Sequence, residues 1–345
     1  MKLPKLGKLA DPLAYNEPID ITGQNVQVLI RQLKMMMLIR QAEEKIADMV
    51  EAKVIKCPCH LGVGQEATAV GVSEYLRPTD RIFGAHRSHT HFLAAGGSLF
   101  ELFSEVLGKE TGCSKGMGGS MHLFDKKIGF LGSVPIVGAS VPIAVGAGLA
   151  AKMDGNGDVA VSYLGDSALE EGGVQEALNL ASVKKLPVVF VVENNFFASH
   201  LHIKLRQPSD TTIRYAHTYG ITSKTIDGNN IVEIAQIASD LIKKVREGEG
   251  PCFIEAVTYR WKGHVGPSED IDVGVKRKDD LFLWKKRDPI SRLVKTLINV
   301  NLLTQNEYSE IQIQTHEEIE RKWAQAEQAP FPKPEALLKL VYKNS

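Results

Sequence analysis

Two apolar runs on either side of one amphipathic segment form the clearest structural pattern in this chain. Residues 158–164 and 188–193 are largely apolar and rich in β-branched side chains, as is typical of strands buried on both faces of a parallel sheet. Between these runs, apolar residues recur at the spacing of one helical face, at Val174, Ala177, Leu178 and Ala181. The pattern predicts a strand, a crossover helix and a second, parallel strand.

Comparable patterns extend this organisation along the chain. Apolar residues follow helical spacing over residues 26–52, and a segment that begins with a proline predicts a helix over 142–152. A helix predicted over 231–247 precedes another apolar strand over 252–259. Residues 280–329 are helical and charged. This order predicts an α/β fold with a mostly parallel central sheet and helices on both faces.

Two glycine-rich segments interrupt these elements. Short helices alternate with glycines over residues 62–97, and seven glycines fall within residues 112–138, which predicts a long loop held close to another part of the protein. Long loops inside compact domains are usually functional. We divide the chain into an N-terminal arm with helices (1–55), an α/β domain (56–285) and a C-terminal helical segment (286–345).

The composition argues against several classes of protein. Lys plus Arg and Asp plus Glu both number 41, so no basic excess indicates a nucleic-acid or membrane partner. No apolar run approaches the roughly 20 residues that cross a bilayer. The N-terminal residues have no secretion or import pattern. We therefore expect a cytoplasmic protein.

The four cysteines are Cys57, Cys59, Cys113 and Cys252, too few in a chain of 345 residues for a disulfide framework. The segment Cys57-Pro58-Cys59-His60 could be interpreted as part of a zinc site. A structural zinc ion takes four nitrogen or sulfur ligands at recognisable spacing, and no second closely spaced pair of cysteines occurs. We expect free thiols.

Polar residues follow both strands of the central pattern. Gly165 and Asp166 follow the first strand, and Asn195 follows the second. Carboxyl ends of neighbouring parallel strands meet at one edge of a sheet, where ligands bind. Carboxylate and amide oxygens suit Mg²⁺, and a crossover helix beginning just after Asp166 would direct its N-terminal amides to an anion. Alternatively, Asp166 only caps that helix, and Asn194 and Asn195 only form a turn.

Gly165-Asp166, followed after 28 residues by Asn195, resembles the thiamine-diphosphate-binding motif. The wider pattern, over residues 37–342, is similar to alpha subunits of pyruvate, branched-chain 2-oxo acid and acetoin dehydrogenases, and Arg87-Ser88-His89 is most similar to the acetoin type. Further family landmarks occur in order, at His60 with Gly64-Gln65-Glu66-Ala67, Gly118 to His122, Ile136-Val137-Gly138, Glu171-Gly172, and Tyr259-Arg260 with Gly263-His264. The resemblance implies a thiamine-diphosphate-binding fold.

The resemblance also implies roles for individual residues. Asp166 and Asn195 would hold Mg²⁺ with their side chains, and Phe197 with its main-chain oxygen. Arg87 and Arg260 would bind the diphosphate, because planar guanidinium groups bind such oxygens well. The other implied cofactor contacts are His86, Pro135, Val137, Gly165, Ser167 and Ala168.

Two histidines are candidates for catalysis. By the resemblance, His264 and His60 would line the reacting centre, where a histidine with a pKa near neutrality moves protons. For His60, simple packing beside a turn is an alternative. His89 and His91 fit a structural or supporting role better than a catalytic one.

Three positions depart from the family pattern. Ser167 stands where the family usually has Gly, so a hydroxyl approaches the diphosphate and either binds or crowds it. Pro135 replaces a residue that is commonly Gly, although its carbonyl can still accept a hydrogen bond. After His264 the regulatory serine pattern of mitochondrial relatives is missing. We expect residues 261–278 to be a mobile active-site loop.

Only one α/β sheet is recognisable in this chain, whereas single-chain thiamine enzymes carry two. The resemblance therefore implies a separate beta chain, in an α₂β₂ assembly. We predict that the pair oxidatively decarboxylates a 2-oxo acid, or cleaves acetoin, and passes the acyl group to a lipoyl-bearing acyltransferase. Two alternatives stay open: a carbon–carbon lyase or ligase without a lipoyl partner, and a non-catalytic subunit that binds the cofactor.

Overall fold

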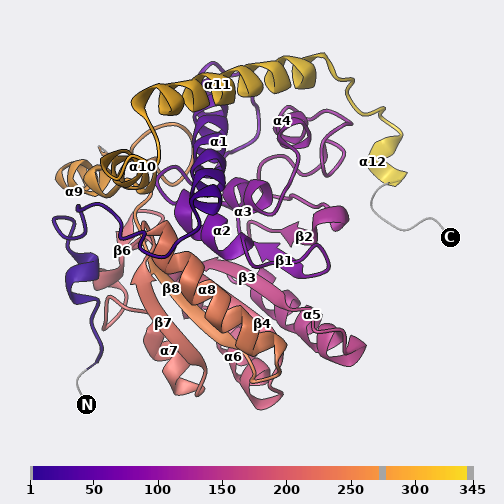
Figure 1. Ribbon diagram of the computed structural model, residues 1–345. Helices are drawn as coiled ribbons and strands as arrows, with labels where there is room; N and C mark the ends of the chain where they lie inside the picture. Colours follow the sequence, from indigo (N-terminus) through magenta and orange to yellow (C-terminus); the bar gives the residue numbers. More distant parts are fainter. Residues whose placement is uncertain (1–2, 272–276, 340–345) are drawn as a thin grey trace.

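Six parallel strands form the central sheet of the computed structural model, which describes residues 3–271 and 277–339. Their spatial order is β2-β1-β3-β4-β8-β7. The strands are β1 (Arg81–Gly84), β2 (Phe130–Ser133), β3 (Ala160–Gly165), β4 (Val188–Asn194), β7 (Thr222–Asp227) and β8 (Cys252–Val257). Helices cover both faces of this sheet (Figure 1), which confirms the predicted α/β fold.

Side chains alternate between two cores, one on each face of the sheet. In β3, Val161 and Tyr163 pack into the first core, while Ala160 and Leu164 pack into the second. Helices α1 (Val26–Glu51), α2 (Glu66–Ser73) and α8 (Ile231–Arg246) contribute to the first core. Helices α5 (Ser140–Asp154), α6 (Gly172–Val183) and α7 (Ile213–Thr218) contribute to the second. The apolar runs are therefore buried on both faces, as expected of parallel strands.

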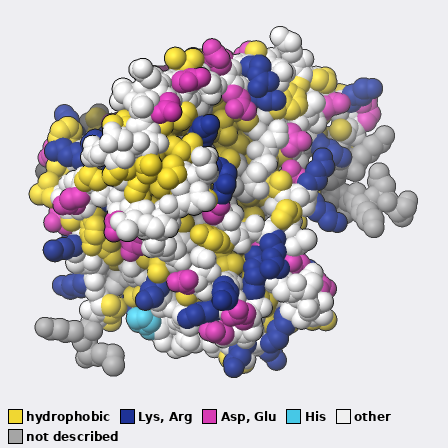
Figure 2. Space-filling model, viewed as in Figure 1, with side chains coloured by type: hydrophobic (Ala, Val, Ile, Leu, Met, Phe, Trp, Pro, Cys, Tyr) yellow, Lys and Arg dark blue, Asp and Glu magenta, His cyan; other side chains and the backbone are white. Residues whose placement is uncertain are grey.

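The remaining helices frame this sheet. They are α3 (His89–Ala94), α4 (Leu99–Val106), α9 (Lys278–Trp284), α10 (Pro289–Asn299), α11 (Gln305–Gln328) and α12 (Ala336–Lys339). Helix α11 crosses the end of α1 (Figure 1) and begins with a capping box formed by Thr304 and Glu307. In the part of the chain that the structure describes, no helix has both the length and the apolar character needed to cross a bilayer. Charges of both signs are interspersed over the face shown in Figure 2.

The predicted elements differ from the observed ones in several respects, among them the edge strand β7, which was not predicted. Helix α6 begins at Gly172 and not just after Asp166, because residues Asp166–Glu170 form a 3-10 turn, η3. The glycine-rich segments contain the short strands β1 and β2, each of four residues, as well as helices and loops. A strand of four residues is too short to show a clear alternation of apolar and polar side chains.

One carboxylate holds the glycine-rich loop that follows α4. Glu105 is buried, and its Oε2 accepts hydrogen bonds from the main-chain N–H groups of Ser114 and Gly116 at 2.7 and 2.9 Å. Its Oε1 accepts from those of Gly118 and Gly119 at 2.7 and 3.0 Å. Four main-chain donors thus converge on a single side chain, which is the close support that the glycines predicted.

Buried ion pairs join the C-terminal helices to the sheet. Asp227, at the end of β7, accepts from Arg287 at 2.9 Å through Oδ1 and from Arg292 at 2.7 Å through Oδ2. Arg40 of α1 donates to Glu66 of α2, with Nη2 and Oε2 2.8 Å apart. We call Arg40, Arg287 and Arg292 the structural arginines, because each is buried and each has a carboxylate partner within 3 Å.

Candidate active site

Most of the predicted site residues follow the carboxyl ends of five neighbouring strands. They are Val137 after β2, His86 and Arg87 after β1, Asp166 and Ser167 after β3, Asn195 and Phe197 after β4, and Arg260 and His264 after β8. All of these except Arg260 line one cavity of about 370 Å³, as does Gly165. The parallel sheet thus brings residues from five distant segments to one edge.

Four of the predicted residues, including Arg260, do not line this cavity. His60 faces His86 and His264 from the end of the segment before α2. Arg260 is fully buried. Pro135 is half-buried in the segment that leads to Val137, and the side chain of Ala168 packs into the second core.

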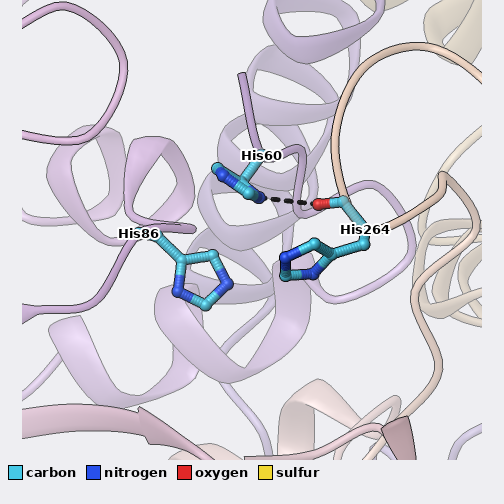
Figure 3. Close-up of side chains that lie close together, drawn as sticks. All are labelled: His60, His86 and His264. Carbon is cyan, nitrogen blue, oxygen red and sulfur yellow. Dashed lines mark hydrogen bonds between the residues drawn. The ribbon is translucent and has the colours of Figure 1, made fainter. Parts of the chain in front are cut away.

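Three histidines form a compact cluster beside the cavity (Figure 3). The ring centroid of His60 lies 4.6 Å from that of His86 and 4.9 Å from that of His264, and the last two are 5.6 Å apart. Nδ1 of His60 lies 2.7 Å from the carbonyl oxygen of His264, so Nδ1–H donates and Nε2 keeps its lone pair. Burial, with neighbouring cationic groups, lowers the pKa of His60 and His264 to about 4 and of His86 to about 2. The cluster is therefore neutral at neutral pH.

Three buried guanidinium groups lie near one another, and in the part of the chain that the structure describes they have no close counter-ion. Within the described residues, Arg87 donates only to main-chain carbonyl oxygens, and Arg277 donates to the carbonyls of Arg260 and Trp261. Among the described residues, their closest approach to a carboxylate is 3.8 Å, between Arg260 Nη2 and Asp270 Oδ2. Nε and Nη1 of both Arg260 and Arg277 have no hydrogen-bond partner there. We call Arg87, Arg260 and Arg277 the site arginines.

The electrostatics of the site arginines fit an anion. Burial lowers the pKa of Arg87 to about 10, and burial together with the charges of Arg87 and Arg277 lowers that of Arg260 to about 9. Both groups stay cationic at neutral pH. A buried cation without a counter-charge lowers the stability of the folded protein, and buried donors without hydrogen-bond partners lower it further. A multiply charged anion such as a diphosphate would supply the missing charge and acceptors.

The predicted metal ligands Asp166, Asn195 and Phe197 line the same cavity. Asp166 is buried and forms an ion pair with Arg206, which also pairs with Glu170. Burial raises the pKa of Asp166, and the guanidinium of Arg206 opposes that effect. The guanidinium of Arg206, from the segment after β6 (Leu201–His202), thus already places a positive charge beside this carboxylate.

The orientation of Asn195 is fixed on both sides. Its Nδ2 donates to Oε1 of Gln65 at 3.0 Å, and its Oδ1 accepts from the main-chain N–H of Phe197 at 3.2 Å. Gln65 belongs to the Gly-Gln-Glu-Ala segment that the resemblance had marked, so a sequence signal for it existed. Arg206 and Arg277 had no such signal.

The structure separates His89 from His91. His89 is buried away from the cavity, with Nε2 2.9 Å from Ser120 Oγ and Nδ1 3.3 Å from Glu43 Oε1. His91 lines the cavity, lies 3.3 Å from Glu193 Oε2 and stacks on a tyrosine. Glu193 also lines the cavity, and its Oε1 has no partner among the described residues. Neither carboxylate was predicted from the sequence.

Apolar surface borders the open side of the site. Ile136 and Val137, in a segment that resembles one of the family landmarks, are exposed. Helices α5 and α6 also carry exposed apolar residues, at Ile143, Leu149, Met153, Leu180 and Val183. The loop expected over residues 261–278 is described to Ile271 and again from Arg277, and residues 272–276 lie outside the described residues.

Comparison with known sequences identifies the family of this chain. The model of the family described as "Dehydrogenase E1 component" matches residues 34–335. The alpha subunit of acetoin:2,6-dichlorophenolindophenol oxidoreductase from Bacillus subtilis is 36% identical over 308 residues, which are 89% of this chain and 91% of that protein. The pyruvate dehydrogenase E1 component subunit alpha from Rickettsia bellii is 32% identical over 313 residues, covering 91% of this chain and 95% of that one.

Proposed function

This chain belongs to the dehydrogenase E1 component family, as an alpha subunit of a thiamine-diphosphate-dependent enzyme, and we propose that its cavity holds the diphosphate end of that cofactor. One observation carries the proposal: three buried guanidinium groups lie beside the cavity without close carboxylates among the described residues. When bound, thiamine diphosphate supplies the electron sink for breaking a bond next to a carbonyl group.

The same cavity offers ligands for magnesium. Asp166 and Asn195 would hold the ion with side-chain oxygens, and Phe197 with its main-chain oxygen, which are the hard ligands that Mg²⁺ prefers. The ion would replace Arg206 as the positive partner of Asp166. Arg206 would then remain paired with Glu170.

The histidine cluster would handle protons and the oxygen of the donor. His60 has a neutral ring whose Nε2 is free to accept a proton, because Nδ1–H is engaged by the His264 carbonyl. The neutral ring of His264 has one N–H that can donate to a developing oxyanion. These roles are compatible with decarboxylation of a 2-oxo acid or cleavage of acetoin, followed by acyl transfer to a lipoyl group.

A separate beta chain would complete the site. Val137 lines the cavity and is exposed, as is Ile136, and α5 and α6 carry further exposed apolar residues. These residues support this proposal, since exposed apolar surface commonly marks interfaces. We propose an α₂β₂ assembly that works with a lipoyl-bearing acyltransferase. The similar proteins are oxidoreductase and dehydrogenase subunits, so they do not favour the lyase or non-catalytic alternatives. The three-part division of the chain and the cytoplasmic location stay predictions.

The metal site provides the sharpest test. In the enzyme assembled with its beta chain, Asp166→Asn should weaken Mg²⁺-dependent binding of thiamine diphosphate, measured by calorimetry, at least about tenfold, because it removes a charged ligand. Asp158→Asn is the matched control, since Asp158 is also buried but lies just before β3, at the opposite edge of the sheet. Equal affinities for the two variants would refute the ligand assignment. A donor screen with 2,6-dichlorophenolindophenol as electron acceptor would then separate 2-oxo acids from acetoin.

A further inference from the structure

The proposed function leaves two neighbouring thiols unused. Cys57 and Cys59 directly precede His60, and their Sγ atoms lie 4.0 Å apart. Both are free; Cys59 is fully buried and Cys57 is partly exposed. Neither belongs to the cluster of potential metal ligands found among the described residues, which is His60, His86 and His264. Neither the proposed function nor the histidine cluster therefore explains why these two thiols lie so close together.

The two sulfur atoms have unequal environments. Cys57 Sγ lies 3.7 Å from the carbonyl oxygen of Val106, and Gly119 leaves the space that Cys57 occupies, since a Cβ there would meet Cys57 Sγ at 3.3 Å. The hydrogen bond with Cys59 lowers the pKa of Cys57 to about 6, and the same interaction, followed by burial, raises that of Cys59. Cys57 is thus the accessible thiolate at neutral pH, and Cys59 is the protonated partner.

Main-chain contacts connect this dithiol to the candidate active site. The carbonyl oxygen of Cys59 accepts a hydrogen bond from the N–H of Gly266 at 2.8 Å. The next residue, His60, donates through Nδ1 to the carbonyl of His264. Cys59, through its carbonyl, and the adjacent His60, through its ring, therefore support the segment that carries His264 at two points.

We propose that Cys57 and Cys59 form a reversible disulfide, and that this bond releases the His264 segment from its support. A disulfide has an S–S length of about 2.05 Å, so the sulfur atoms must approach by roughly 2 Å. Proline fixes φ at residue 58, so much of the adjustment falls on the peptide groups on either side of it. The Cys59 carbonyl then turns away from Gly266.

A peroxide is the class of oxidant that this geometry fits. The Cys57 thiolate attacks one peroxide oxygen, the O–O bond breaks, and the leaving oxygen takes a proton, which gives a sulfenic acid on Cys57. Cys59 sulfur then attacks Cys57 sulfur and loses its proton, and the second oxygen leaves as water. Two thiols and one hydrogen peroxide thus give one disulfide and two water molecules. A disulfide in so short a ring is strained, which makes it readily reducible by a dithiol.

The chemical half of the proposal can be tested without an activity assay. The complete enzyme, with its beta chain, is treated with one equivalent of hydrogen peroxide and analysed by peptide mass spectrometry. We expect a peptide that spans Cys57 and Cys59 and has lost two hydrogen atoms, restored by dithiothreitol. Cys113→Ser, which changes another partly exposed cysteine, should leave this product intact. Cys59→Ser should stop at a sulfenic acid on Cys57. A free Cys59 thiol after full oxidation of Cys57 in the wild type would overturn the proposal.

Hydrogen exchange tests the coupling to the active site. In the oxidised enzyme, the Gly266 amide should exchange at least about tenfold faster than in the reduced enzyme, because it loses its acceptor, and dithiothreitol should reverse the change. Cys59→Ser should show no peroxide-dependent change. A disulfide that forms without faster exchange at Gly266 would overturn the switch. Neither readout depends on the reaction that the enzyme catalyses, so a failure of the proposed function would remain distinguishable.

Discussion

The structural arginines and the site arginines are equally buried but are compensated differently. Each structural arginine has a carboxylate partner within 3 Å and ties a C-terminal or N-terminal helix to the α/β core. Among the described residues, no site arginine comes closer than 3.8 Å to a carboxylate. Unpartnered buried N–H groups occur in both sets, on Arg260 and Arg277 and also at Nε of Arg287. Neither burial nor an unpartnered N–H group therefore identifies a functional arginine here, whereas the lack of a close carboxylate among the described residues does.

The difference separates stability from binding. When a buried cation is paired with a carboxylate, removal of either partner strongly lowers the free energy of unfolding. A buried cation without one costs stability until a ligand arrives. Mutations in the first group should therefore change unfolding, and mutations in the second should change ligand affinity.

The largest effect is expected at Asp227, which serves two structural arginines. Asp227→Asn leaves the charges of Arg287 and Arg292 without their carboxylate, and should lower the free energy of unfolding by about 3–5 kcal/mol. Denaturant unfolding followed by circular dichroism measures this loss. Asp240→Asn, at an exposed position of α8, is the control and should change stability by less than about 0.5 kcal/mol. Equal stabilities would remove the contrast between the two sets.

The site arginines should respond in the opposite way. Arg260→Met should weaken thiamine diphosphate binding by about 2 kcal/mol or more, roughly 30-fold, because a buried charge partner of the diphosphate is lost. The cofactor-free assembly should be as stable as the wild type or more stable, since an uncompensated cation disappears. Calorimetry and thermal unfolding provide the two readouts. A destabilised protein with normal affinity would place Arg260 among the structural arginines.

Arg206 is an intermediate case, because it pairs with a carboxylate that we assign to the metal. Arg206→Met should destabilise the cofactor-free enzyme, since Asp166 loses its partner. It should also tighten Mg²⁺-dependent cofactor binding by about tenfold, or about 1.4 kcal/mol, because the ion no longer has to displace a guanidinium. Titrations with and without Mg²⁺ measure both. Weaker cofactor binding would instead mean that Arg206 contacts the diphosphate.

The histidine cluster should give the smallest effect, visible as a dependence of stability on pH. The pKa of His60 and His264 falls on folding from about 6.5 to about 4. The unfolded chain therefore binds more protons, and stability that is fully present above pH 6.5 should be lost as the pH falls toward 4. Partial exposure of His264 reduces the size of this loss. A His264→Gln variant should show a shallower decline over this range, and an unchanged slope would show that the ring does not titrate as described.

Sequence patterns predicted the long elements and the edge of the sheet where the cavity lies. Strands β3, β4 and β8 have six or seven residues and are buried on both faces, so their apolar runs were readable. Strand β7 has a mixed pattern of exposed and buried residues on the edge of the sheet and was missed.

The site was predictable only where a motif or a strand end marked it. Asp166 and Asn195 follow adjacent strands, so the parallel topology alone brings them together. Arg206 and Arg277 come from irregular segments whose path depends on tertiary packing, and nothing local relates them to the cavity. The 3-10 turn before α6 was likewise not predicted. It is too short to show a periodic apolar pattern, so its sequence cannot be distinguished from that of the first turn of an α-helix.

The all-parallel sheet also affects how the chain reaches its native state. Arg81 pairs with Ala160, and Val189 pairs with Cys252, so each of these contacts closes a long stretch of chain. Folding with such distant pairings is intrinsically slow. During that time apolar helices such as α5 stay uncovered, and α5 keeps an exposed apolar side even after folding. In the proposed assembly, newly made chains are exposed to aggregation until the beta chain covers this surface, so synthesis of the two subunits in balanced amounts should matter for the yield of soluble enzyme.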